Sequence, residues 1–152
     1  MNTNLTAKVK ECAYKIGADL VGISPISRFK NAPIMMSPQG ILPTAQSVVV
    51  CAIHHLDEAI ELGGEEHPQI IGPYSIQYVM NLKLDYIAFR VARYLDSLGY
   101  EAVPIAASNI WRYRPFESLS ATFAPDISHI YAATCAGLGQ LGWHGLTMSP
   151  EY

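Results

Sequence analysis

Four glycines fall within nine residues, at positions 137, 139, 142 and 145, and this crowding constrains the fold more than any other feature of the sequence. Glycine has no Cβ and adopts positive φ freely, so the segment predicts a bent stretch of open backbone. No charged residue occurs from Ile127 through Pro150. We expect such a segment to be covered by protein or by a bulky, mostly apolar ligand. A helix C-cap followed by a tight, packed turn is the alternative, although a cap needs one glycine rather than four.

Gly137, Gly139 and Gly142 also spell G-x-G-x-x-G, the spacing of the dinucleotide-binding fingerprint. That pattern has physical meaning when a strand leads into it and a helix leads out, so that the helix N-terminus faces the pyrophosphate. Here the order is reversed, because a helix-forming run precedes the glycines and residues 143–148 have β character. The spacing therefore does not predict a Rossmann site.

The rest of the hydrophobic pattern predicts a single α+β domain over residues 1–152. A chain of 152 residues is about one domain long, and with 50% hydrophobic and 15% charged residues it is not disordered. The uneven connections favour a mixed sheet flanked by helices, and Gly17 and Gly99 are placed to end the first two helices. We expect helices over 5–16, 75–98 and 127–136, strands over 20–24, 47–53, 100–105 and 145–148, and a surface loop over 57–66.

Charge and cysteine content exclude several classes of function. The 10 Lys and Arg against 13 Asp and Glu give a net charge of −3, and no basic run marks a nucleic-acid surface. Cys12, Cys51 and Cys135 have neither disulfide nor metal-ligand spacing, so we expect buried thiols, no metal site and a cytoplasmic setting. The sequence shows neither a secretory signal nor an unbroken apolar run of about 20 residues, so we expect no membrane span.

The glycine segment and its flanks resemble a known protein family. The run AGLGQLGWHGLTMSPEY resembles the signature of the epoxyqueuosine reductase and reductive dehalogenase group of corrinoid iron–sulfur proteins. Phe123–His129 (FAPDISH) and Ser108–Pro115 (SNIWRYRP) are similar to segments of a branch of that group. KIGADLVGIS and PTAQSVVVCAI stand where the group has two further segments. The resemblance spans nearly the whole chain and is most specific at the glycines.

This resemblance implies a nitroreductase-like cobalamin-binding core. In the family a ferredoxin-like part with CxxCxxCxxxCP runs follows this core and holds two 4Fe–4S clusters. None of the cysteines in this chain forms such a run. The resemblance therefore implies the cobalamin-binding part alone, with the clusters expected after residue 152. It implies no cobalt-ligating histidine.

Binding a corrin requires small residues and open main chain beside a wide ring with apolar faces, and N–H groups for its amides and phosphate. Asn109, Arg112 and Arg114 form a polar cluster in which an arginine is a candidate to hold a phosphate or a substrate anion, with a surface salt bridge as the alternative. The other candidate cofactor-binding residues surround the glycines: Ala136, Gly137, Leu138, Gly139, Gly142, Trp143, His144 and Gly145.

Two residues upstream of the glycines are candidate catalytic groups. The family implies an acidic proton donor, and Asp126 is the nearest acid, although the reductase pattern has its aspartate about one helical turn earlier, where this chain has Phe123. Asp126 is also placed to cap the helix that follows. His129 shares its face and could orient the acid, contact the ring or be a satisfied core histidine. The resemblance to the dehalogenases implies a tyrosine as proton donor instead, and Tyr113 and Tyr131 are the candidates for it.

The leading hypothesis is a cytoplasmic cobalamin-binding domain of a reductive iron–sulfur enzyme that acts on a small-molecule substrate. Whether the chain by itself is an enzyme stays open, as does whether it forms a homodimer. A nitroreductase-like fold also binds FMN, so a flavin reductase is one alternative. A non-catalytic module that hands a corrinoid to a partner is another.

Overall fold

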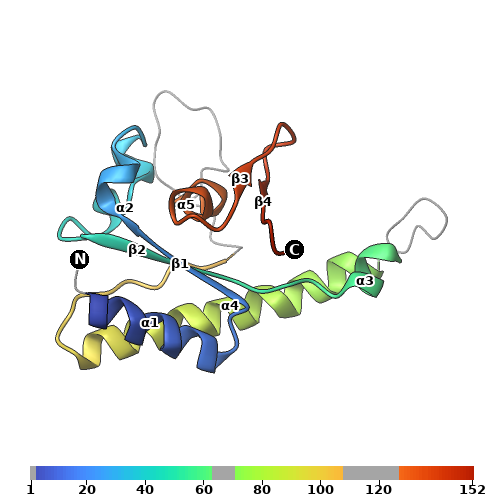
Figure 1. Cartoon of the computed structure of the whole chain (residues 1–152), viewed down its shortest axis with the longest axis horizontal. Coiled ribbons are helices and arrows are strands. Elements are labelled where there is room, and N and C mark those ends of the chain that lie inside the picture. The colour runs from blue at the N-terminus through green and yellow to red at the C-terminus, as the bar shows by residue number, and fades with distance from the viewer. Residues whose placement is uncertain (1–2, 63–70, 108–126) are drawn as a thin grey trace.

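The structure is a computed structural model and describes residues 3–62, 71–107 and 127–152. It is a mixed α+β fold, as the sequence predicts (Figure 1). No helix in these three ranges is long and apolar enough to cross a membrane. The elements are, in chain order, α1 (Thr3–Ile16), β1 (Leu20–Pro25), the 3-10 helices η1 (Ile26–Phe29) and η2 (Ile34–Met36), α2 (Pro38–Ile41), β2 (Ser47–Ala52), α3 (Asp57–Glu61), α4 (Ile71–Ser97), α5 (His129–Cys135), β3 (Gln140–Leu141) and β4 (Thr147–Met148).

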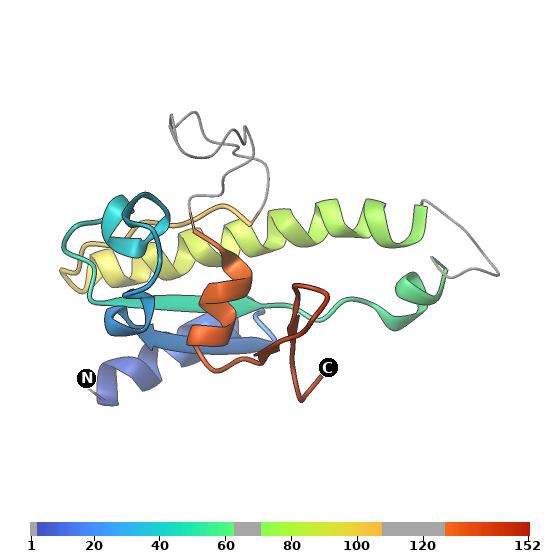
Figure 2. The same cartoon turned by 90° about the horizontal axis from the view of Figure 1, so that it is seen from above.

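An antiparallel ribbon of two strands, β1 and β2, lies between two layers of helix (Figures 1 and 2). Val21 lies opposite Cys51, and the next residue, Gly22, lies opposite Val50. Because successive side chains of a strand point to opposite faces, these two pairs belong to different faces of the ribbon. α1 and α4 cover the face of Val21 and Cys51, and α5 covers the face of Gly22 and Val50.

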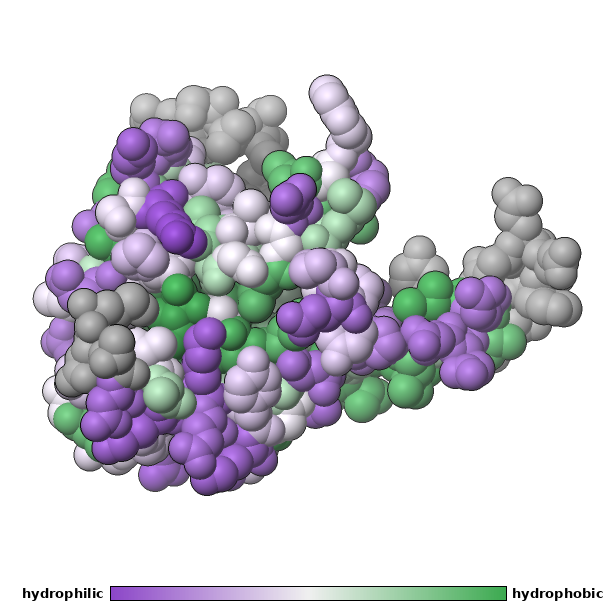
Figure 3. Space-filling view, viewed as in Figure 1, coloured by the Kyte–Doolittle hydropathy of each residue, from purple (hydrophilic) through white to green (hydrophobic). Residues whose placement is uncertain are grey.

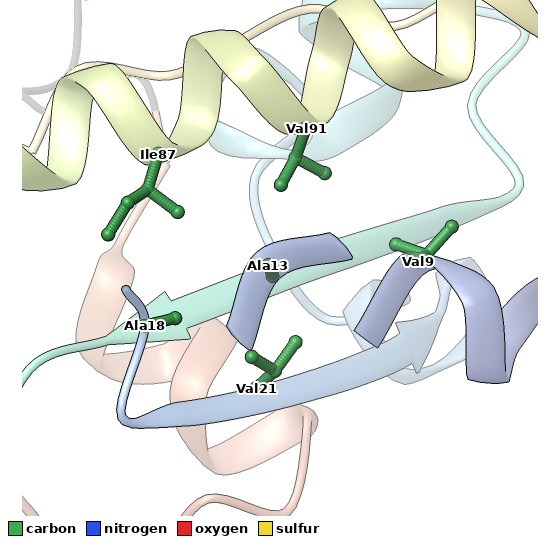
Figure 4. Close-up of a cluster of buried hydrophobic side chains, with 6 residues drawn as sticks. All are labelled: Val9, Ala13, Ala18, Val21, Ile87 and Val91. Carbon is green, nitrogen blue, oxygen red and sulfur yellow. The ribbon is translucent and has the colours of Figure 1, made fainter. Parts of the chain in front are cut away.

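The face covered by α1 and α4 carries a core of aliphatic side chains (Figure 4). Ile87 of α4 is fully buried, and Val91 follows it four residues later on the same side of the helix. Val9 and Ala13 repeat this spacing on α1, and Val21 of β1 completes the contact. Burial of each large aliphatic side chain contributes about 1.5–3 kcal/mol to folding.

The opposite face of the ribbon is covered by α5 through smaller side chains. Gly22 of β1 lies under the end of this helix, and a Cβ at that position would be 2.7 Å from the Cβ of Ala136. Glycine at this position therefore permits the close approach of helix and strand. The buried residues of this face are Phe29, Ile127, Ala132 and Cys135.

Three helices end in the same glycine motif. Gly17, Gly99 and Gly137 have φ angles of 106°, 83° and 77°. At each of them the glycine N–H donates to the carbonyl three residues earlier, and the following N–H donates to the carbonyl five residues before it. This is the Schellman arrangement, which satisfies carbonyls that the helix leaves free. The caps predicted at Gly17 and Gly99 are confirmed.

The prediction of a single mixed sheet is wrong for the described residues, which form two separate two-stranded antiparallel sheets. The strand predicted over 100–105 is also absent, although the segment is not helical. Pro104, the fifth of its six residues, has no backbone N–H, so a continuous ladder would be interrupted there. Just after this segment, the Ala107 N–H donates to Asp85 Oδ1 of α4 at 2.7 Å.

α4 starts earlier than the sequence predicts, and α3 is a helix that the sequence does not predict. α4 begins at Ile71 rather than at residue 75, and Pro73 falls in its first turn, where no N–H is needed for an intrahelical bond. α3 occupies half of the surface loop predicted over 57–66. Asp57 and Glu58 stand in its first turn, where negative charge is favourable.

Candidate functional site

The candidate site is the glycine hairpin, which we define as residues 137–148 (Figures 1 and 2). α5 leads into it, and β3 and β4 pair antiparallel within it, which agrees with the prediction that no Rossmann turn is formed. In the loop between the strands the Gly145 N–H donates to Gly142 O at 3.0 Å, and the Gly142 N–H donates to Leu146 O at 2.8 Å. The predicted strand over 145–148 is shorter in the structure, because Gly145 belongs to the turn.

The four glycines of the hairpin fall into two pairs. Gly139 and Gly142 are enclosed by the hairpin itself: a Cβ on Gly139 would overlap a carbonyl oxygen of β4, and one on Gly142 would be 2.8 Å from the His144 ring. Gly137 and Gly145 have positive φ, and nothing lies within 4 Å of the place where a Cβ would stand. The open backbone predicted from the sequence is therefore present at two of the four glycines, and the packed-turn alternative applies to the other two.

Two threonines and an arginine fasten the hairpin and the end of α5. Thr147 Oγ1 donates to Ile130 O at 2.9 Å and lies 3.3 Å from Thr134 Oγ1. Arg28 Nη1 donates to Cys135 O at 2.5 Å, where its positive charge also meets the negative end of α5. These contacts fix β4 against α5, and α5 against η1.

The hairpin exposes large apolar side chains. Trp143 is fully exposed, and the other three are each more than half exposed. No acidic or basic residue accompanies them, since the sequence is uncharged from Ile127 through Pro150. Large apolar side chains left exposed on one short segment make the hairpin a candidate binding surface. The exposed side chains are Leu141, Trp143, Leu146 and Met148.

Both candidate histidines are bound to backbone groups. His144 Nδ1 accepts a hydrogen bond from the Leu146 N–H at 3.1 Å, and its ring lies against Gly142. His129 Nε2–H donates to Ala106 O at 2.9 Å and so joins α5 to the segment after α4. His129 is exposed, so it is not the core histidine of one alternative, and its contact with Ala106 O is a structural one.

The start of α5 differs from its prediction. The helix begins at His129, and its N-cap is Ser128, whose Oγ accepts from the Tyr131 N–H at 3.2 Å. The prediction that Asp126 caps this helix is therefore wrong. Tyr131 Oη donates to Arg28 O at 3.1 Å, and partial desolvation followed by hydrogen bonding with Cys135 raises the pKa of the Tyr131 phenol. A raised pKa makes this phenol a weaker proton donor.

The other polar residues predicted for the site lie outside the described residues. They are Asp126, Asn109 and Arg112, and the alternative donor Tyr113 lies outside as well. The structure therefore gives no geometry for the predicted acid or for the polar cluster. Within the described ranges, no group of three or more His, Cys, Asp or Glu side chains could hold a metal ion.

Sequence reasoning missed three residues that build the site. Gly22 lets α5 approach β1, and an isolated glycine inside an apolar strand is a recognised signal for such an approach. Thr134 and Thr147 connect α5 to β4, and no sequence pattern marks them because the contact joins two separate elements. The residues that carry the exposed apolar surface, by contrast, lie within the segment singled out from the sequence.

Comparison of the chain with family models, with curated proteins and with solved structures gives no match. The resemblance to the corrinoid iron–sulfur group therefore rests on the sequence motifs alone.

Proposed function

We propose that the chain is the cobalamin-binding domain of a reductive corrinoid iron–sulfur enzyme and that the glycine hairpin is its cofactor surface. The observation that carries the proposal is the set of exposed apolar side chains on an uncharged hairpin, which includes Leu141, Trp143 and Leu146. A corrin ring offers a broad apolar face of the kind that would cover them. The family signature falls on these same residues.

Two further features of the surface support a wide, flat ligand. Gly137 and Gly145 are exposed and have open space where a side chain would stand, which lets a ring approach the main chain closely, and their N–H groups already donate to Thr134 O and Gly142 O. Figure 3 shows hydrophobic residues in the middle of the molecular face, over the ribbon of β1 and β2 and below α5. The face therefore offers apolar surface on the ribbon as well as on the hairpin.

Under this proposal the domain binds the cobalamin and does not itself supply electrons. A bound cobalamin supplies low-valent cobalt for a reduction. Cys12, Cys51 and Cys135 do not form a cluster-binding run, so the electrons would come from iron–sulfur clusters outside this sequence. The residues of the hairpin would hold the ring and exclude water from its face.

An anaerobic titration with cob(II)alamin, followed by electron paramagnetic resonance, tests the proposal. Substitution of Gly139 or Gly142 would be a poor test, because both are enclosed and a side chain would disrupt the hairpin itself. The exposed side chains are better targets, since their removal leaves the fold unchanged. We expect wild type to bind the cofactor base-off, and Trp143→Ser and Leu146→Ser to weaken binding by about tenfold each.

The matched control is Leu56→Ser, because Leu56 is 62% exposed, like the hairpin residues, but lies outside the hairpin. The control should bind as wild type does. Absence of cobalamin binding, or an equal loss in Leu56→Ser, would contradict the proposal. A parallel titration with FMN separates the flavin alternative: binding of FMN that is lost in Trp143→Ser, with cobalamin ignored, would replace the corrinoid by a flavin.

A further inference from the structure

An open groove of about 730 Å³ lies between α1 and α4, in a different part of the structure from the hairpin. This volume falls within the range of roughly 300–1,000 Å³ that is usual for small-ligand sites. Hydrophilic residues gather over α1 on the face shown in Figure 3. Four of the ten Lys and Arg residues of the chain line the groove: Lys8, Lys15, Arg90 and Arg93.

The positive charge of the groove is largely uncompensated. Glu11 is the one acid among its lining residues, and Glu11 Oε1 lies 2.6 Å from Lys15 Nζ. Lys8 and Arg93 have no ion-pair partner in the part of the chain that the structure describes. Since the whole chain has a net charge of −3, this groove is a local concentration of positive charge.

Two further features of the groove bear on what it could bind: the contacts of Arg90 and an apolar lining. Arg90 is held in place, because Arg90 Nη1 donates to Tyr86 Oη at 2.6 Å and the guanidinium carbon lies 5.6 Å from the centre of the tyrosine ring. The half-buried side chains of Cys12, Ile16 and Tyr94 line the groove between the cations. A ligand here would therefore meet positive charge together with apolar surface.

We propose that this groove binds a small organic phosphate, with the phosphates on Lys8, Arg90 and Arg93 and the organic part on the apolar lining. Guanidinium and ammonium groups are the usual partners of phosphate oxygens. The cations are confined to one groove rather than spread along a surface, which favours a small ligand over a nucleic acid. The inference uses no residue of the glycine hairpin and stands apart from the corrinoid proposal.

Calorimetric titration of the full chain with ATP and with inorganic pyrophosphate tests this inference. We expect ATP to bind more tightly than pyrophosphate, because only ATP has a group for the apolar lining. Lys8→Gln and Arg93→Gln should each weaken ATP binding by about tenfold, the effect of losing one hydrogen bond to a charged group. Lys30→Gln removes an exposed cation that does not line the groove and should leave binding unchanged.

The thiol of Cys12 gives a second readout, since it lies within the groove. Cys135 is buried, and burial raises the pKa of Cys51 to about 11, so Cys12 should be the most reactive of the three toward a maleimide. Bound ATP should slow labelling of Cys12, measured by peptide mass spectrometry. Lack of ATP binding, an equal loss in Lys30→Gln, unchanged labelling of Cys12, or equal affinity for pyrophosphate would each overturn the proposal.

Discussion

The two faces of the β1–β2 ribbon are covered in different ways. On one face α1 and α4 bring aliphatic side chains such as Ile87 and Val91 into a continuous core. On the other face α5 packs closely over Gly22, and the chain then continues into a hairpin whose apolar side chains are exposed. The first face of the ribbon is filled by side chains of the described residues, whereas the hairpin that follows α5 carries apolar surface that the described residues do not cover.

This difference suggests which residues serve stability and which serve binding. A well-filled core supplies folding free energy, and its residues are explained by packing alone. Exposed apolar side chains supply little to folding, and under our proposal those of the hairpin bind the ring. Substitutions on the α1–α4 face should therefore alter stability, and those on the hairpin should alter binding.

The largest expected effect on stability comes from Ile87→Ala, in the core between the ribbon and helices α1 and α4. Ile87 is fully buried, so the substitution leaves a cavity and should lower the free energy of unfolding by about 2–5 kcal/mol. Leu82→Ala on the outer side of α4 is the control, since Leu82 is 52% exposed and should change stability by less than about 0.5 kcal/mol. Urea denaturation measures both, and equal losses would contradict the assignment of the core.

The next effect is expected at the contact between the ribbon and α5. In Gly22→Ala the new Cβ would meet the Cβ and carbonyl oxygen of Ala136 at 2.7 and 2.8 Å, so α5 must shift, at a cost of about 1–3 kcal/mol. Amide hydrogen exchange should quicken in α5 and stay unchanged in α1 and α4. Equal acceleration in all three helices would show that the two faces open together as one cooperative unit, which would contradict the comparison.

The pH dependence of stability tests the burial of Cys51, which packs on the ribbon face covered by α1 and α4. Burial raises the pKa of this thiol from 9.0 to about 11, so the unfolded chain loses the thiol proton first as pH rises. Stability should therefore fall between pH 9 and pH 11. Thermal melts across this range should show a shallower fall in Cys51→Ala, and an unchanged slope in that variant would contradict the burial of the thiol.

The smallest effect on stability is expected at two matched helix caps. Gly99 and Gly137 both have positive φ, and nothing lies within 4 Å of either missing Cβ. Alanine at either position should cost about 1–2 kcal/mol through backbone strain alone. Thermal melts should thus give similar losses, while a cobalamin titration should show weaker binding only in Gly137→Ala. Equal binding by the two variants would remove Gly137 from the cofactor surface.

The sequence predicts those parts of the fold that depend on local pattern. The helix ending at Gly17 and the two strands of the ribbon follow from periodicity and from a glycine cap, and all three are present. The strand expected over 100–105 is absent, because strand formation requires a partner that the segment itself does not specify. In the hairpin, the enclosure of Gly139 by β4 is a contact between elements, so the sequence alone could not separate it from the open Gly137.

Hydrogen exchange of the wild-type chain with and without cob(II)alamin tests most directly whether the hairpin is the ligand surface. Our account predicts slower exchange of backbone amides in residues 137–148 when the cofactor is present, with α1 and α4 unaffected. Unchanged exchange in the hairpin at saturating cofactor would contradict it.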